Sequence, residues 1–239
     1  MMSVRVLIGM VLILALSLRF ASQAQNSNFE MERNDMVTRQ IEARGIHHKA
    51  TLQAMRKVPR HLFVPDQLWS SAYRDNPLPI GYRQTISQPY IVAYMTASID
   101  PKPDDKILEI GTGSGYQAAI LGEIADSVFS VEIVDELAKQ ASDLLAKMGY
   151  GNIHVKGGDG YYGWPQYAPY DKIIVTAAAE EIPPLLVEQL SEGGLMILPV
   201  GPEFGMQYLV LVEKKDGEVH RKNMLPVRFV PFTRDEEND

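Results

Sequence analysis

Three alternate glycines constrain the fold more than any other feature of the chain. Gly111, Gly113 and Gly115 lie between an apolar run at 106–110 and a helical pattern at 116–125. Glycine lets the backbone turn sharply and lets a ligand approach where a Cβ would clash. The carboxyl end of a buried strand beside a helix N-terminus is where α/β sheets bind nucleotides. This segment therefore predicts a strand, a cofactor-binding loop and a helix.

The rest of the chain continues this alternation of strands and helices. Further strands are predicted at 128–131, 152–155, 172–176 and 195–198, with helices at 135–148 and 183–190. Strands that alternate with helices favour a mostly parallel, doubly wound, Rossmann-like sheet. An apolar stretch at 207–212, followed by the turn residues Asp216 and Gly217, predicts an antiparallel hairpin at the C-terminal edge.

The segment before the first strand is different in character. Helices are predicted at 29–46, 51–58 and 87–99, with an extended stretch at 61–65. Pro77, Pro79 and Gly81 interrupt residues 73–85, which predicts a long loop without regular structure. We expect one domain over 29–234, consisting of a helical cap with its long loop (29–100), a cofactor-binding core (101–200) and the hairpin (201–234).

The first 24 residues resemble a targeting segment. Arg5 precedes an apolar run at 6–18, and small residues follow at Ala21–Ala24, which is typical of a secretory signal peptide. The run is shorter than the roughly 20 residues of a membrane-spanning helix. A cleaved signal predicts a periplasmic or secreted protein with no stable membrane association. A retained anchor and a mis-assigned start codon are the alternatives.

Composition narrows the range of partners. The formal net charge of −7 disfavours nucleic acid as a partner, because phosphate binding needs clustered Lys and Arg. The chain has no cysteine, which excludes disulfides and thiolate ligands. No pair among its five histidines has the spacing of metal ligands, so no metal site is expected.

The sequence around the glycine loop also indicates the kind of cofactor. A pyrophosphate-binding fingerprint would need glycine where this chain has Tyr116, which disfavours NAD and FAD and fits a cofactor without phosphate. Glu132 follows the second strand, where an acidic residue can bind ribose hydroxyls. Gly158, Asp159 and Gly160 follow the third strand, where the Asp can reach an adenine amino group. Alternatively, the glycines only form turns and Glu132 caps a helix.

Several segments together resemble the protein-L-isoaspartate O-methyltransferase family. They are Tyr73–Gly81, Gln84–Tyr90, Leu108–Tyr116, Gly158–Gly160 and Gly194–Gly201, within a similarity that extends over 36–232. The resemblance implies a class I S-adenosylmethionine-dependent methyltransferase. It also implies a substrate, the free α-carboxylate of L-isoaspartyl residues in damaged proteins, whose methyl ester closes to a succinimide and is partly hydrolysed to aspartate. The family is usually cytoplasmic.

The resemblance also implies roles for individual residues. Ser87 corresponds to the active-site serine. The substrate-binding residues implied are Asp75, Pro77, Leu78, Pro79, Ile80, Thr85 and Gln88. The cofactor-binding residues implied for S-adenosyl-L-methionine are Glu109, Gly111, Thr112, Gly113, Ser114, Gly115, Glu132, Gly158, Asp159 and Gly160. Partners are then isoaspartyl-containing proteins and peptides, and the enzyme is expected to be a monomer.

The chemistry needs few residues. A carboxylate is deprotonated at neutral pH and a sulfonium is already activated, so alignment and removal of water are what the protein supplies. Ser87 has no adjacent His or Lys base and is not predicted to be a nucleophile. Its local pattern, just before Pro89, also fits an ordinary helix N-cap. Two other functions are left open, a methyltransferase for small-molecule carboxylates and a non-catalytic isoaspartyl-binding module.

Overall fold

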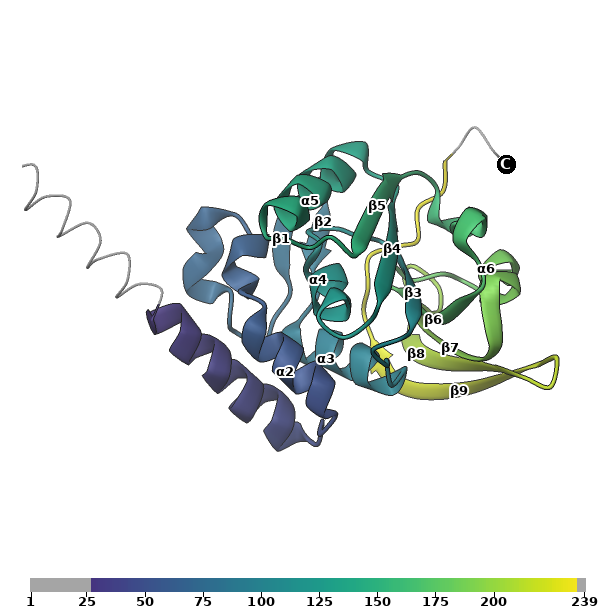
Figure 1. Cartoon of the computed structure of the whole chain (residues 1–239), viewed down its shortest axis with the longest axis horizontal. Helices are drawn as coiled ribbons and strands as arrows, with labels where there is room; N and C mark the ends of the chain where they lie inside the picture. Colours follow the sequence, from purple (N-terminus) through teal and green to yellow (C-terminus); the bar gives the residue numbers. More distant parts are fainter. Residues whose placement is uncertain (1–26, 236–239) are drawn as a thin grey trace, which may run out of the picture.

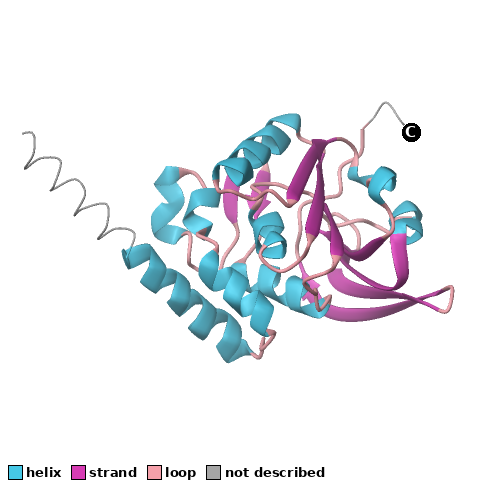
Figure 2. Ribbon diagram, in the orientation of Figure 1, coloured by secondary structure: helices cyan, strands magenta, loops and turns pink. Residues whose placement is uncertain are grey.

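A computed structural model describes residues 27–235, and its centre is a seven-stranded sheet (Figures 1 and 2). The strand order is β5-β4-β3-β6-β7-β8-β9. The first five strands in this order pair in parallel, and β8 and β9 are antiparallel. The strands are β3 (Lys106–Ile110), β4 (Ser127–Glu132), β5 (Ile153–Gly157), β6 (Tyr170–Val175), β7 (Leu190–Val200), β8 (Gln207–Lys215) and β9 (Glu218–Val227). The predicted Rossmann-like fold with an antiparallel C-terminal edge is confirmed.

Both faces of the sheet are covered. Ile107 packs in one apolar cluster with helix α4, and its neighbour Leu108 packs in a second cluster with Leu186 of helix α6. Figure 1 shows α4 and α5 on one side of the sheet and α6 on the other. Successive strand residues point to opposite faces, so apolar residues at consecutive positions require two covered faces. After the N-terminal helix come the α-helices α2 (Lys49–Lys57), α3 (Pro89–Ser98), α4 (Tyr116–Gly122), α5 (Asp135–Lys147) and α6 (Pro184–Gln189).

The strand order places a crevice next to β3. The chain passes from β3 to β4 and β5 on one side, then returns to β6 on the other side. Ligands of open α/β sheets bind at the carboxyl ends of strands where the order reverses in this way. The loops after β3, β4 and β6 therefore meet at one place.

The N-terminal cap is helical, as predicted, but one of its segments differs from the prediction. Residues 27–35 are helical and continue through η1 (Met36–Ile41) and η2 (Glu42–Arg44) to Gly45, whose φ is +92°. The stretch at 61–65, predicted to be extended, instead lies mainly in a 3₁₀ turn, η3 (Arg60–Phe63). Arg60, His61 and Phe63 are all buried there, so tertiary packing decides the conformation. A further 3₁₀ turn, η4 (Asp66–Ser71), follows, and the core has η5 (Gly160–Tyr162) and η6 (Pro165–Tyr167).

The loop predicted at 73–85 is partly a β-hairpin, which corrects the expectation that its prolines exclude regular structure. Strands β1 (Leu78–Gly81) and β2 (Gln84–Ile86) pair in a separate two-stranded sheet. A two-stranded ribbon has only edge strands, and proline is tolerated where no ladder N–H is required. Tyr82 and Arg83 both have positive φ, +50° and +59°, the geometry of a tight hairpin turn.

After β9 the chain runs back across the strand ends. The Ala178 N–H donates to the carbonyl of Val230 at 2.8 Å, and the Phe232 N–H donates to the carbonyl of Ala178 at 2.8 Å. We call residues 228–235 the C-terminal segment. The proposed signal peptide lies outside the described residues. None of the helices found between residues 27 and 235 is long and apolar enough to span a membrane.

Candidate active site

The glycine loop has the geometry that its sequence predicts. Gly111, Gly113 and Gly115 have φ values of +91°, +53° and +87°. A Cβ on Gly111 would lie 2.3 Å from Oγ1 of Thr176, which donates to the Gly111 carbonyl at 2.7 Å. Both the backbone conformation and the close approach of the Thr176 side chain therefore favour glycine at position 111.

The Glu132 side chain supports the same loop. One carboxylate oxygen accepts the N–H of Gly113 at 2.7 Å, and the other accepts the N–H of Val134 at 3.0 Å. Glu132 is buried at the end of β4, as the spacing from the loop predicts. Each carboxylate oxygen has a further lone pair that can accept from a ligand hydroxyl.

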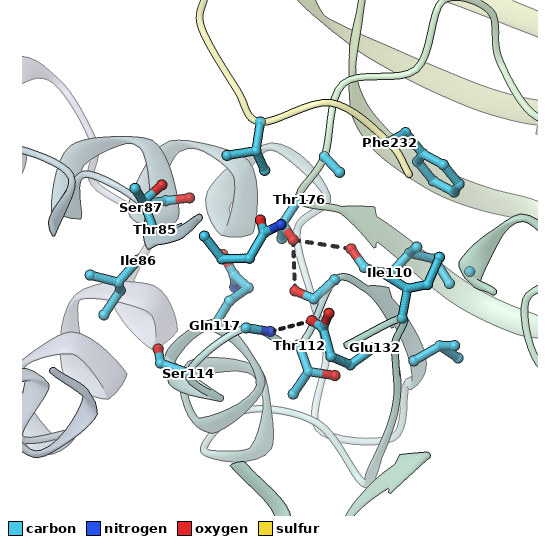
Figure 3. Close-up of a pocket in the computed structure, with 18 of the residues that line it drawn as sticks. Thr85, Ile86, Ser87, Ile110, Thr112, Ser114, Gln117, Glu132, Thr176 and Phe232 are labelled. Carbon is cyan, nitrogen blue, oxygen red and sulfur yellow. Dashed lines mark hydrogen bonds between the residues drawn. The ribbon is translucent and has the colours of Figure 1, made fainter. Parts of the chain in front are cut away.

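These groups line a cavity, called here the first cavity. It has an empty volume of about 780 Å³, part of it open to solvent. Figure 3 shows Ser87 and Thr85 at one side, Phe232 at the opposite side, and Thr176, Thr112 and Glu132 between them. Of the predicted residues, those that line it are Thr85, Ser87, Gly111, Thr112, Gly113, Ser114, Glu132 and Gly160.

A second cavity adjoins the first. Its lining includes Pro77, Gln88 and Phe229. Four residues line both cavities: Thr85, Ser87, Thr176 and Val230. A group bound in the second cavity can therefore meet a group bound in the first, and Ser87 is at the junction.

Ser87 is not the N-cap of the following helix. The N-cap position of α3 is Gln88, and the N–H of Tyr90 donates to the Asp75 carboxylate at 3.0 Å. Asp75 thus caps the helix from outside it, and also accepts from the Gln88 side chain at 2.7 Å and from Arg44 at 2.5 Å. Within residues 27–235, the Ser87 hydroxyl makes no hydrogen bond to another residue.

Four predicted cofactor residues do not line the first cavity: Glu109, Gly115, Gly158 and Asp159. Glu109 is fully buried, accepts a hydrogen bond from Ser130, and has a pKa that burial raises to about 8. Asp159 accepts from the N–H of Tyr161 at 2.9 Å and from Nε of Arg234 at 2.8 Å. The Ser130 hydroxyl also lies 2.6 Å from the Thr112 hydroxyl, so Glu109 supports the glycine loop through Ser130. The Asp159 bonds fix the loop after β5 and join the C-terminal segment to the core.

The other predicted residues lie around the cavities. Pro77 lines the second cavity, Leu78 is buried in the cap, and Pro79 is exposed. Ile80 lies against the loop, because a Cβ on Gly113 would meet its Cδ1 at 3.3 Å. Gly115 packs under α5, and Gly158 has a φ of +148° without lining the first cavity.

The structure also brings in residues that were not predicted. Thr176 follows β6, and the rule that strand ends meet at one edge could have identified it. Gln117 lies on α4, where the helical pattern gives no sign of its role. The C-terminal segment contributes Val230, Pro231, Phe232 and Thr233 to the first cavity. Its contacts are long-range, so no local pattern marks them.

Comparison with protein-family models matches residues 31–237 to the family described as protein-L-isoaspartate(D-aspartate) O-methyltransferase. A protein-L-isoaspartate O-methyltransferase from Opitutus terrae is 58% identical over 204 residues, covering 85% of this chain and 88% of the relative. One from Picosynechococcus sp. is 55% identical over 200 residues, covering 84% and 89%.

Solved structures agree with this match. A protein-L-isoaspartate O-methyltransferase structure has a TM-score of 0.76 and 29% identity over 83% of this chain, and the chain spans 65% of that structure's length. A putative protein-L-isoaspartate O-methyltransferase from Plasmodium falciparum, in complex with S-adenosyl-L-homocysteine, has a TM-score of 0.75 and 23% identity. The match covers 85% of this chain and 99% of that structure's chain. The latter shares the fold.

Proposed function

The chain belongs to the protein-L-isoaspartate(D-aspartate) O-methyltransferase family, and we propose the residues with which it carries out the family's reaction. It transfers a methyl group from S-adenosylmethionine to the free α-carboxylate of L-isoaspartyl residues in damaged proteins. The resulting ester closes to a succinimide, whose hydrolysis returns part of the chain to aspartate. One observation carries the assignment of residues: the two cavities meet at Ser87.

The lining of the first cavity fits S-adenosylmethionine. None of the residues that line it is Lys or Arg, so a pyrophosphate would have no countercharge there. The glycines allow close approach of the backbone, and the Glu132 carboxylate can accept from ribose hydroxyls.

We assign cofactor binding to the predicted residues that line this cavity. S-adenosylmethionine supplies a methyl group on a positively charged sulfur, which needs no further activation. Gly111, Thr112, Gly113 and Ser114 would contact it along the loop. Glu109 and Gly115 support the glycine loop without lining the cavity. Asp159 holds the turn that contains Gly160 through its hydrogen bond with the N–H of Tyr161.

The second cavity is assigned to the isoaspartyl residue. The Ser87 hydroxyl is free to donate to one carboxylate oxygen, which leaves the other oxygen to attack the methyl carbon. An α-carboxylate has a pKa of roughly 3.5 and is ionised at neutral pH, so no general base is needed. Thr85, Pro77 and Gln88 line the path that the substrate chain would follow, and Asp75 holds Gln88 in place.

The C-terminal segment serves to keep water from the reacting groups. Val230 lies at the junction of the two cavities, and Phe232 lines the first. The segment is held to the core by the paired hydrogen bonds with Ala178 and by the Arg234–Asp159 ion pair. Desolvation of a carboxylate increases its reactivity toward a sulfonium.

A methyl-transfer assay on an isoaspartyl peptide beside its aspartyl twin tests this function. We expect label from S-adenosylmethionine to enter the isoaspartyl peptide alone, as a base-labile ester. Equal labelling of both peptides would refute the specificity. Binding of the isoaspartyl peptide without labelling would identify a non-catalytic binding module, and labelling of small carboxylic acids alone would indicate a small-molecule enzyme.

Export is a separate proposal. The basic start, the apolar run at 6–18 and the small residues at Ala21–Ala24 support a cleaved signal peptide and a periplasmic or secreted enzyme. Amino-terminal sequencing of the protein from fractionated cells tests it. Mature protein that begins near Gln25 outside the cytoplasm supports export. Protein that begins at Met1 or Met2 in the cytosol contradicts it.

We also propose that residues 29–234 act as one domain and as a monomer, without nucleic acid. Every residue assigned to the site comes from this one chain, and the net charge of −7 opposes phosphate binding. Light scattering coupled to size exclusion would test the monomer, and a mass twice that of the chain would contradict it.

A further inference from the structure

Arg60 is a buried charged residue without an acidic partner. Its side chain is 0% exposed, and no carboxylate in residues 27–235 forms an ion pair with it. Burying an unpaired charge is costly, and burial lowers the pKa of Arg60 to about 10. Because a buried, unpaired guanidinium destabilises the fold, we looked for a role of Arg60 in its hydrogen bonds.

The hydrogen bonds of Arg60 indicate that role. Its Nε donates to the carbonyl of Ala72 at 2.8 Å, and its Nη2 donates to the carbonyl of Ser87 at 2.8 Å. These two carbonyls flank residues 73–86, which we call the hairpin segment and which contains β1 and β2. One guanidinium therefore holds both ends of the segment that leads to Ser87.

The same guanidinium contacts the cofactor side of the site. Its Cζ lies 4.9 Å from the ring centroid of Tyr116, in a cation–π contact. Tyr116 is the first residue of α4, directly after the glycine loop, and lines the first cavity. Arg60 thus touches the two ends of the hairpin segment and the start of the cofactor helix.

We propose that Arg60 is a positioning residue, which fixes Ser87 relative to the glycine loop by holding both ends of the hairpin segment against α4. The inference rests on the proposed role of Ser87. The planar guanidinium, which donates here through Nε and Nη2, suits this task, whereas a lysine ammonium is a point charge without the fork. Methyl transfer depends on alignment, so a small displacement of Ser87 has a large kinetic effect.

The test compares Arg60→Lys with the wild type, with Met55→Ala as a control. Met55 is fully buried in the same cap and lines neither cavity, so its truncation tests the effect of destabilising the cap. We expect Arg60→Lys to lower kcat on isoaspartyl peptide on the order of 10- to 100-fold, with affinity for S-adenosyl-L-homocysteine kept within about twofold. Met55→Ala should lower Tm and leave kcat unchanged at 25 °C.

A double-mutant cycle with Ser87→Ala separates positioning from general stabilisation. If Arg60 acts through Ser87, Arg60→Lys has little further effect on kcat in the Ser87→Ala background, because interacting residues are not additive. Full additivity of the two kcat losses overturns the proposal. So does a kcat loss in Met55→Ala equal to that in Arg60→Lys.

Hydrogen exchange gives a measurement that does not depend on activity. Amides of residues 73–86 should exchange faster in Arg60→Lys, with those of α4 and β3 unchanged. Failure of both Arg60→Lys and Arg60→Gln to fold or to bind S-adenosyl-L-homocysteine would make Arg60 a folding residue and overturn the proposal. Failure of the wild type to methylate the isoaspartyl peptide would refute the proposed function instead, while the exchange result still decides whether Arg60 holds the hairpin segment.

Discussion

The two sides of the active site are built in different ways. The cofactor side consists of a strand, a turn and a helix that follow one another in the chain. Its contacts are made at the carboxyl ends of neighbouring strands, where Gly111 meets Thr176 and Glu132 accepts from the N–H of Gly113. The substrate side is assembled from distant segments, since Arg60, Asp75 and Ser87 are brought together by contacts across the cap. The glycine loop therefore fixes where the cofactor binds, whereas the position of the acceptor site depends on how the cap folds against the core.

The largest effect is expected on the cofactor side, from Gly111→Ala. The added Cβ would overlap Oγ1 of Thr176, at a φ of +91° that alanine rarely adopts. We expect S-adenosyl-L-homocysteine affinity to fall by about 3 kcal/mol, roughly 100-fold, in calorimetry. Gly149→Ala is the matched control: its φ is +89° and its Cβ would meet nothing within 4 Å. Equal loss of affinity in both variants would show that backbone strain alone is measured.

On the substrate side, Ser87→Ala should separate turnover from cofactor binding. Loss of the hydroxyl removes the donor to the substrate carboxylate, so kcat should fall on the order of 10²-fold, while affinity for S-adenosyl-L-homocysteine changes little. Ser98→Ala, at the end of helix α3 and with its hydroxyl bonded to the Tyr94 carbonyl, serves as the control. Unchanged kcat in Ser87→Ala would remove the serine from the mechanism.

Glu109→Gln tests whether the buried acid binds the cofactor or only supports the loop. Burial raises the pKa of Glu109 from 4.5 in the unfolded chain to about 8, so the folded state binds more protons between these values. Its stability contribution is greatest below pH 4.5 and is lost as pH rises toward 8. In urea unfolding at pH 8.5, the free energy of unfolding of Glu109→Gln should exceed that of the wild type by on the order of 2 kcal/mol, and at pH 4.5 this gain should be absent. Tenfold weaker cofactor binding would instead indicate direct contact.

His61 in the cap should show the opposite pH dependence. Burial first, and then the charge of Arg33, lower its pKa from 6.5 to about 4, so the folded cap holds it neutral. Its contribution is fully present above pH 6.5 and is lost as pH falls toward 4. Between pH 7 and pH 5 the free energy of unfolding of the wild type, measured in urea, should fall by about 1–2 kcal/mol more than that of His61→Gln. Parallel pH curves for the two proteins would contradict this.

The cofactor side was largely predictable from the sequence. The glycine spacing, the acid after the second strand and the Asp216–Gly217 turn each follow from local backbone chemistry, and the mostly parallel pairing of the sheet follows from the alternation of elements. The substrate side was named only through family resemblance. The hairpin at 78–86 was not predicted, because Pro77 and Pro79 disfavour a strand inside a sheet. Both of its strands are edge strands, in which proline is tolerated.

Long-range contacts explain the other omissions. Ser87 looked like a helix cap until the structure placed Asp75 on the α3 N-terminus. Arg60 directly precedes the stretch that was predicted to be extended, and its contacts with Tyr116, Ala72 and Ser87 are all long-range. The C-terminal segment reaches the first cavity only because β9 runs antiparallel to β8 and returns the chain to the strand ends.

A crystal structure with S-adenosyl-L-homocysteine and an isoaspartyl peptide would show whether the two reactants meet at Ser87. We expect the homocysteine sulfur in the first cavity, beside the glycine loop. We also expect the α-carboxylate at the junction of the two cavities, with one oxygen within hydrogen-bonding distance of the Ser87 hydroxyl. A peptide carboxylate bound away from Ser87, or a sulfur that faces away from the second cavity, would contradict this expectation.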